Sequence, residues 1–399
     1  MGLRSIKEIF ITGHGPSSSH TMGPYFASQY ILNKYHDIKR VEVTLFGSLS
    51  LTGKGHLTDY IIDLAFKDIP HEIIFDTKTK KKHPNTMNFR VTTSEKVYSE
   101  NIISSGGGSI ITIDNIAEQE TKTIYPLQLM GDIVNFCKKE GISFYDYVKK
   151  FEDDDIEEYF ANVLKVMDEA VERGLSTEGL LPGSLRVKRK AKDMLSAMEE
   201  TTLGVNDVAM NVAIHAFAVA EENAAGGIVV TAPTCGSAGV IPGCIRYLRM
   251  KNVADKDIIR GLMVAGLFGI VCKTNASVSG AEAGCQAEIG VACSMGAAMI
   301  AFCFGKEMDD IVQAAEIALE HSLGLTCDPV DGYVQIPCIE RCAIYAIKAI
   351  NAVKLSIVIP NDDIHVSYDD SVRTMYKTGL DMNKKYKETS LGGLAEILK

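Results

Sequence analysis

The chain has no excess of basic residues and no long apolar run, and both absences limit what it can do. Its 399 residues include 41 Lys and Arg against 51 Asp and Glu, a formal net charge of −10. Because nucleic-acid binding relies on basic surface, we expect no nucleic-acid partner. The longest apolar stretches, Gly261–Cys272 and Val291–Phe304, are short and rich in Gly and Ala. They predict buried helices, and we expect no membrane partner.

We also expect no leader for secretion. MGLRSIKEIF at the N-terminus has neither the apolar core nor the small-residue cleavage site of a signal peptide. Ile6 stands where an N-myristoylation signal has Ser or Thr. We therefore expect a cytoplasmic protein. Thiols stay reduced in that compartment, so the ten cysteines predict free thiols or metal ligands and not disulfides.

Common cofactor motifs are absent as well. The stretch Asn223–Gly239 (NAAGGIVVTAPTCGSAG) lacks the spacing of a phosphate-binding P-loop and of a dinucleotide fingerprint. Its small-residue loop could still bring backbone N–H groups close to an anion, so Thr234 and Gly236 are candidates for substrate contacts. No lysine lies in an obvious Schiff-base context, and we expect no pyridoxal phosphate.

Hydrophobic patterning divides the chain into three parts. In residues 1–120, Val41–Ser50 alternates like a strand and Thr58–Phe66 has helical spacing. Residues 121–170 are charged and helical in pattern, and they predict a connector of surface helices. From 171 to 399 the pattern is helical, with Gly/Pro-rich loops that are typical places for functional residues. We predict a multidomain protein: an N-terminal α+β domain, a helical connector and a C-terminal all-α catalytic domain.

Three of the ten cysteines lie in turn-forming sequence. They are Cys285 in SGAEAGCQAEIG, Cys327 in GLTCDPVDG and Cys338 in QIPCIER. Cys235 also lies in a turn and stays ambiguous. Six others lie in apolar stretches, where cysteine acts as a small hydrophobe: Cys137, Cys244, Cys272, Cys293, Cys303 and Cys342. Structural zinc usually takes four ligands, whereas three thiolates suit an iron–sulfur cluster with one iron left open as a Lewis acid.

Polar side chains also gather in GPSSSHTMGP near the N-terminus. Ser17, Ser18, Ser19, His20 and Thr21 stand between two Gly/Pro turns and ahead of a helical segment. A single serine would be enough to cap a helix. Three serines with a histidine therefore favour a ligand site, at a helix N-terminus where carboxylates are stabilised.

A second glycine-flanked turn, SLSLTGKGHLTD, contains Lys54 and His56. A solvated turn and a substrate-binding role are equally compatible with this sequence. We keep both residues as candidates for contacts with a substrate carboxylate.

Together these motifs resemble the bacterial iron–sulfur-dependent L-serine dehydratases (L-serine ammonia-lyases). The similar segments run from GPSSSHTMGP and FGSLSLTGKGHLTD through NASVSGAEAGCQAEIGVACSMGAA and GLTCDPVDGYVQIPCIER to KYKETSLGGLA. The resemblance thus covers the whole chain. It is closest to the single-chain form, in which a small β domain, similar to allosteric-substrate-binding domains, precedes the catalytic α domain.

The resemblance implies a lyase that converts L-serine to pyruvate and ammonia in amino-acid degradation and gluconeogenesis. Because an exposed iron is readily lost to oxygen, we expect an oxygen-sensitive enzyme, and we expect a homodimer, the usual state of a cytoplasmic enzyme of this kind. It assigns Cys285, Cys327 and Cys338 as ligands of a 4Fe-4S cluster, and it places His20 where the small domain caps that cluster. Some relatives supply a further ligand from a C-terminal cysteine. This sequence ends at Lys399 without one, so we expect no thiolate from the tail.

His20 is the first candidate for the base that removes the Cα proton of the substrate, because imidazole titrates near neutral pH. An ionised serine of the same turn, Ser18 or Ser19, is the rival. The remaining polar residues of the two turns are expected to bind or orient the substrate: Ser17, Thr21, Lys54 and His56.

Three other interpretations stay open. The same chemistry suits threonine or cysteine as substrate, because a pocket discriminates one methyl group by only about 1–3 kcal/mol. A non-catalytic amino-acid sensor would bind its ligand through the small domain alone. Zinc held by the cysteines would be structural or hydrolytic. The many polar loops of the helical part favour an enzyme over a sensor.

Overall fold

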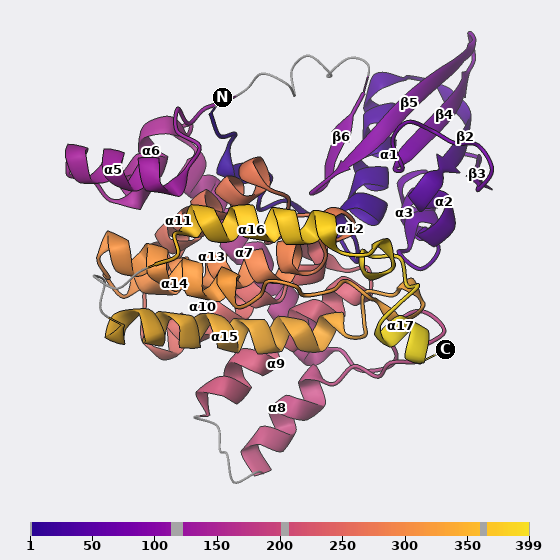
Figure 1. The fold of residues 1–399 in the computed structure, drawn as a ribbon. Coiled ribbons are helices and arrows are strands. Elements are labelled where there is room, and N and C mark those ends of the chain that lie inside the picture. Colours follow the sequence, from indigo (N-terminus) through magenta and orange to yellow (C-terminus); the bar gives the residue numbers. More distant parts are fainter. Residues whose placement is uncertain (1, 113–122, 201–206, 360–364, 399) are drawn as a thin grey trace. The chain divides into compact units, whose positions relative to one another are not determined.

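The computed structural model describes residues 2–112, 123–200, 207–359 and 365–398, and its chain divides into two units (Figure 1). The small unit is Gly13–Lys122, and the helical unit combines the N-terminal residues up to Thr12 with Thr123–Lys399. The sequence prediction of an α+β region followed by a helical region is confirmed at this level.

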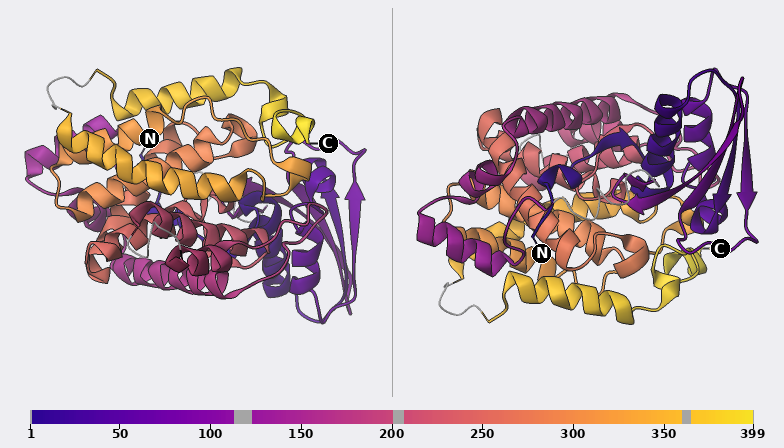
Figure 2. Two further views of the ribbon diagram at one scale, coloured as in Figure 1. Left: turned by 90° about the horizontal axis from the view of Figure 1, so that it is seen from below. Right: turned by 90° about the horizontal axis from the view of Figure 1, so that it is seen from above.

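The small unit is a mixed sheet with helices along one face. Its elements are α1 (Gly23–Lys34), β2 (Ile38–Phe46), α2 (Gly47–Thr52), α3 (Thr58–Ala65), β3 (His71–Asp76), β4 (Thr86–Thr93), β5 (Val97–Gly106) and β6 (Ser109–Ile111). The strand order is β3-β2-β4-β5-β6, with β2 parallel to β3 and all other neighbours antiparallel. Figure 2 shows this sheet nearly edge-on, with the helices of the unit on one side.

Alternating side chains build the core of the small unit. Val43 of β2 pairs with Phe89 of β4, and both are fully buried, whereas the next residue, Arg90, is exposed on the other face. Ile31 of α1 and Ile62 of α3 belong to the same buried cluster. One face of the sheet is therefore covered by α1 and α3.

The strand expected over Val41–Ser50 differs from the observed one at its C-terminal end. β2 ends at Phe46, and Gly47 follows with a φ of +54°. A positive φ suits glycine, which has no Cβ. The chain turns there into α2, so the apolar residues after Phe46 are helical.

The helical unit contains most of the chain. Its helices are α5 (Met130–Glu140), α6 (Phe144–Phe151), α7 (Ile156–Ser176), α8 (Ala191–Glu200), α9 (Val208–Ala224), α10 (Val240–Met250), α11 (Asp255–Asn275), α12 (Gly280–Ala283), α13 (Val291–Cys303), α14 (Met308–Glu320), α15 (Cys338–Val358), α16 (Tyr368–Asp381) and α17 (Leu394–Ile397). Two short strands lie outside the five-stranded sheet, β1 (Thr12–His14) and β7 (Ile228–Val230).

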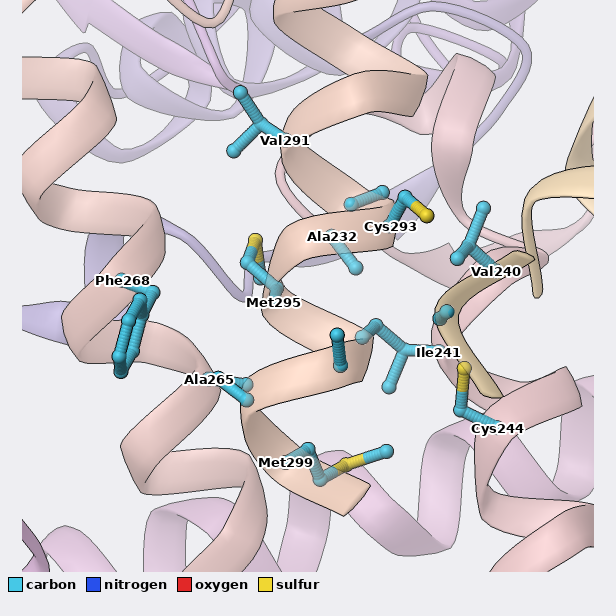
Figure 3. Packing of buried hydrophobic residues seen from close by; sticks show 14 of the residues in the cluster. Ala232, Val240, Ile241, Cys244, Ala265, Phe268, Val291, Cys293, Met295 and Met299 are labelled. Carbon is cyan, nitrogen blue, oxygen red and sulfur yellow. The ribbon is translucent and has the colours of Figure 1, made fainter. Parts of the chain in front are cut away.

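Helix α13 lies at the centre of this unit. Every residue of Val291–Ala301 is buried, and the helix packs against α10, α11, α14 and α15. Figure 3 shows its side chains beside Phe268 of α11 and beside Ile241 and Cys244 of α10. A Cβ at Gly296 of α13 would lie 2.8 Å from the Cys244 sulfur. Small side chains on α13 thus let its neighbours approach closely.

One helical stretch of the described residues, Gln286–Cys303, is long and apolar enough to span a bilayer. The expectation that every apolar run is too short is therefore wrong for this stretch. Its burial explains the composition, because 83% of the stretch is inside the protein. The predictions of buried helices at Gly261–Cys272 and Val291–Phe304 are confirmed by α11 and α13, whose described residues there are mostly buried.

The stretch 121–170, expected as a connector of surface helices, forms α5, α6 and most of α7. Ile133, Phe144 and Phe160 from these helices are almost fully buried, in the same core cluster as α13. Each helix has one apolar face that packs inward, while its charged residues cover the outer face. The high charge of the sequence marks that outer face only.

Candidate active site

Three loops of the helical unit bring Cys285, Cys327 and Cys338 together. Cys285 precedes a π-helical turn, Gln286–Gly290, that leads into α13, and Cys338 is the first residue of α15. The thiols of Cys285 and Cys327 hydrogen-bond to each other, and Cys338 lies close enough to Cys285 for their charges to interact. Cys285 and Cys327 are buried, and Cys338 is half-buried.

A carboxylate lies against these thiols. Glu288 Oε2 is 3.8 Å from Sγ of Cys327, and the Thr234 hydroxyl donates a hydrogen bond to the same carboxylate. Burial raises the pKa of Glu288. A Cβ at Gly236 would lie 3.5 Å from Oε1 of Glu288, and a Cβ at Gly280 would lie 2.4 Å from its Oε2. Thr234 and Gly236, both candidates from the sequence, therefore lie next to Glu288, which in turn lies next to Cys327.

Arg341 supplies positive charge at the same place. Its guanidinium donates to the Thr326 carbonyl at 2.7 Å and to Asp328 Oδ1 at 3.1 Å, and it also hydrogen-bonds to Cys285. The hydrogen bond from Cys327 lowers the pKa of the Cys285 thiol, and Arg341 acts in the same direction. A neighbouring cation stabilises thiolate, which is the form that binds metals.

A second carboxylate, Glu388, comes from the C-terminal segment of the chain. Burial raises its pKa to about 8, with further contributions from Glu288 and Cys285. Its carboxylate accepts a hydrogen bond from the Ala281 N–H. Two carboxylates that interact in a low-dielectric place favour a cationic group between or beside them.

The donors grouped here are thiols, two carboxylates and one guanidinium. Within the described ranges, no three or more His, Cys, Asp or Glu side chains are spaced to hold one metal ion. In an iron–sulfur cluster each thiolate binds a different iron. Three thiols with the Arg341 cation beside them match the type of donor that such a cluster takes.

Two other cysteines lie next to this group. The Cys342 thiol donates to the Gly236 carbonyl at 3.3 Å, and burial raises its pKa to about 12. Burial also raises the pKa of Cys235, and Glu288 adds to that shift. Both thiols are therefore protonated at neutral pH, as expected of cysteines that serve in packing.

In the small unit, hydroxyl groups surround His20. Ser17 caps the π-helical turn Ser18–Met22 by accepting the His20 N–H at 3.2 Å. Ser19 Oγ lies 2.8 Å from Nδ1 of His20, and Ser48 Oγ lies 3.0 Å from Nε2. Both ring nitrogens of His20 are thus hydrogen-bonded to serine hydroxyls, one as donor and one as acceptor when the ring is neutral.

His56 lies beside His20, with 4.7 Å between their ring centroids. The Thr21 hydroxyl donates to the His56 carbonyl at 2.7 Å, and His56 Nδ1 lies 3.0 Å from the Thr52 carbonyl. That carbonyl can only accept, so it fixes the proton on Nδ1 and leaves Nε2 basic. Burial lowers the pKa of both histidines, and His56 lowers that of His20 further. Both rings are therefore neutral at neutral pH.

The other two candidates of the small unit differ in their placement. Ser18 is buried in the same turn, where its carbonyl accepts the Gly23 N–H. Lys54 is exposed, with Nζ 5.5 Å from the centroid of the Phe75 ring. The fold thus groups the SSSHT turn with His56 and leaves Lys54 outside the cluster.

Four residues of these clusters were not predicted from the sequence. Glu288 and Arg341 each stand three positions after a cysteine, Cys285 and Cys338, at a spacing that places them on the same helical face. That spacing could have identified them. Ser48 and Glu388 reach their clusters through the fold and carry no local signal.

Comparison with known proteins agrees with the resemblance noted in the motifs. Residues 5–68 match the family model of the serine dehydratase beta chain, and residues 73–395 match that of the alpha chain. The boundary between the two matches lies inside the small structural unit.

Curated relatives are similar over nearly the whole chain. L-serine dehydratase 2 of Escherichia coli is 41% identical over 98% of both chains. The L-serine dehydratase of Helicobacter pylori is 39% identical over 99% of both chains, and that of Streptomyces coelicolor is 37% identical over 98% of both. The chain therefore belongs to the serine dehydratase family, in the form that joins the beta-chain and alpha-chain regions in one polypeptide.

Proposed function

We propose that the chain is an L-serine ammonia-lyase that converts L-serine to pyruvate and ammonia. Similarity to proteins named L-serine dehydratase over almost their full length supports the reaction. The observation that carries the mechanism is the grouping of Cys285, Cys327 and Cys338 with Arg341 in the helical unit. A cytoplasmic homodimer is part of the same proposal.

The three cysteines would hold a 4Fe-4S cluster, and no pyridoxal phosphate is involved. When bound, the cluster supplies a Lewis-acidic iron without a protein thiolate, which would bind the serine carboxylate and make its β-hydroxyl a better leaving group. Arg341 would offset the negative charge of the thiolates through its hydrogen bond to Cys285.

Glu288 and Glu388 would receive the ammonium group of the substrate. Both carboxylates interact with each other and with Cys285, and Thr234 orients Glu288 through its hydroxyl. A substrate ammonium would offset the negative charge of Glu288, which otherwise raises the pKa of Glu388. This role favours an amino acid over a hydroxy acid that lacks the amino group.

His20 remains the first candidate for the base that takes the Cα proton. It is neutral, as a base must be, and its contacts with Ser19 and Ser48 let a serine hydroxyl pass a proton to the ring. In such a relay a serine would take the Cα proton and His20 would accept the proton of the serine hydroxyl, so the two rival bases would act together. His56 is a second candidate for the base, because the Thr52 carbonyl leaves its Nε2 unprotonated.

The proposed reaction balances without an added oxidant or reductant. Removal of the Cα proton and departure of the β-hydroxyl release one water and leave aminoacrylate. Aminoacrylate tautomerises to an imine, and addition of one water to the imine gives pyruvate and ammonia. The later steps occur in solution and need no further residue.

Anaerobic purification followed by a visible spectrum and a pyruvate assay on L-serine tests the proposal. We expect a brown protein whose activity is lost in air and partly restored by Fe²⁺ and a thiol without oxygen. A colourless protein that stays inactive after iron–sulfide reconstitution would overturn it in favour of zinc or a sensor. Relative kcat/KM for serine, threonine and cysteine separates the three substrates.

A further inference from the structure

The segment Tyr386–Leu394 is hydrogen-bonded to the loop that contains Cys327. The Cys327 N–H donates to the Tyr386 carbonyl, and the Glu388 N–H donates to the Cys327 carbonyl, both at 2.8 Å. Cys327 and Lys387 form a parallel β-bridge. Both backbone polar groups of one candidate ligand are therefore held by residues near the C-terminal end of the described chain.

Asp328 connects the same segment to Arg341. Its Oδ2 accepts the Leu394 N–H at 2.9 Å, while its Oδ1 accepts from Arg341 Nη2 at 3.1 Å and from the Thr326 hydroxyl at 3.2 Å. The residue is only 4% exposed. A buried carboxylate with donors on both oxygens is strongly oriented, because leaving any of these groups unpaired would be costly.

Gly393 leaves no room for a side chain at this junction. A Cβ there would lie 2.2 Å from Asp328 Oδ2, and the backbone has a φ of +62° and a ψ of −138°. Only glycine adopts that conformation readily. Because Gly393 has no side chain, the backbone lies close enough to Asp328 for the Leu394 N–H to reach the carboxylate.

We propose that Asp328 is a positioning residue for the cysteine site. Its carboxylate hydrogen-bonds both to the segment Tyr386–Leu394 and to Arg341. Arg341 in turn hydrogen-bonds to Cys285, and the segment hydrogen-bonds to the backbone of Cys327. Two ligand thiolates are thereby held in one arrangement by a single buried carboxylate. The identity of the bound cluster rests on the proposed function, but the coupling is a property of the chain before a cluster binds.

A role in general stability alone would have different consequences. Loss of Asp328 would then lower the stability of the whole helical unit without a local effect on Cys327 or on cluster retention. The coupling predicts a local effect, because residues that orient ligands change metal affinity by about 10- to 100-fold.

Substitution Asp328→Asn in the full chain tests the coupling. Before reconstitution we expect hydrogen exchange at the Cys327, Glu388 and Leu394 amides to become about tenfold faster, since an amide cannot pair both Arg341 and Leu394 as a carboxylate does. After anaerobic reconstitution we expect the brown colour to bleach in air about tenfold faster. Asp309→Asn is the matched control, because Asp309 forms an exposed ion pair with Lys138. It should change neither rate.

Gly393→Ala gives a second test that leaves the carboxylate in place. Its control is Gly305→Ala, where φ is +64° and no atom lies within 4 Å of the added Cβ. We expect faster exchange and bleaching for Gly393→Ala and little change for Gly305→Ala.

Wild-type exchange and bleaching rates in both Asp328→Asn and Gly393→Ala would overturn the proposal. If the wild-type chain took up no iron, the proposed function would fail instead, and hydrogen exchange of the chain without a cluster would still decide whether the coupling exists.

Discussion

Burial imposes a neutral state on His20 and His56, and this makes the small unit sensitive to acid. Both residues have a pKa below the ordinary value of 6.5 in the folded chain. The unfolded chain therefore binds more protons below pH 6.5. The stability that depends on these neutral rings is fully present above that pH and is lost as the pH falls through the folded-state pKa values.

We expect the urea concentration at the denaturation midpoint of the small unit to decrease as the pH is lowered from about 7 to about 5. The double variant His20→Gln, His56→Gln should show a flatter dependence over the same range. Urea denaturation with hydrogen exchange as a local readout measures both. Parallel profiles for the wild type and the double variant would contradict the buried neutral state.

Single cysteine substitutions separate ligands from packing residues. Cys285→Ala, Cys327→Ala and Cys338→Ala should each abolish the brown colour of the anaerobic protein. Cys137→Ala should keep it, because burial raises the pKa of Cys137 to about 11 in the core. Cys342→Ala is a closer control, one helical turn from Cys338. Colour that survives in any of the first three variants would break the ligand assignment.

Glu288 tests the proposed site for the substrate ammonium. Glu288→Gln removes the negative charge from the proposed contact with the substrate ammonium. Because a hydrogen bond to a charged group contributes about 1.5–3 kcal/mol, KM for L-serine should rise about 10- to 100-fold. Affinity for 3-hydroxypropionate, which has no amino group, should change little. Glu340→Gln is the control, since Glu340 is on α15 with its side chain 69% exposed. Equal losses of affinity for both ligands would remove the ammonium role.

At the scale of elements, glycines set the distance between helices. A Cβ at Gly174 of α7 would lie 2.2 Å from the Ala218 carbonyl oxygen of α9. Backbone cannot rotate away as a side chain can, so Gly174→Ala should force the two helices apart and destabilise the unit by about 1–3 kcal/mol. The shift of the denaturant midpoint at constant slope measures this.

Gly131 of α5 provides the opposite case. The nearest atom to a Cβ there is Asp369 Oδ2 at 3.4 Å, an ordinary contact. Gly131→Ala should be neutral or should stabilise the chain by up to about 1 kcal/mol, because alanine restricts the unfolded chain. Similar destabilisation by the two substitutions would mean that helix spacing at Gly174 is not the cause.

Local patterns predicted the elements and clusters that depend on neighbours in sequence. The SSSHT turn was predictable because its hydroxyls and His20 are adjacent, and the three cysteines because turn formers flank each of them. Long-range pairing was beyond such patterns. Glu388 reaches the cysteines only because the segment Tyr386–Leu394 pairs with the Cys327 loop, and the inward face of α5–α7 was hidden by their charged outer face.

At the scale of the whole molecule, two separate buried clusters support two units. One cluster combines Val43, Phe89 and their neighbours in the small unit, and the other surrounds α13 in the helical unit. All three candidate cluster ligands belong to the helical unit. A ligand that binds only one folded region stabilises that region selectively.

Anaerobic reconstitution with iron and sulfide should therefore protect the helical unit first. In hydrogen exchange of the full chain, peptides from α13 and α15 should gain protection, because Cys285 leads into α13 and Cys338 begins α15. Peptides from β2 and β4 should exchange as before, since no candidate ligand lies in the small unit. Cys327→Ala, treated in the same way, should show no gain. If β2 and β4 gained as much protection as α13, a ligand of the cluster would lie in the small unit. The assignment of the cluster to Cys285, Cys327 and Cys338 would then be wrong.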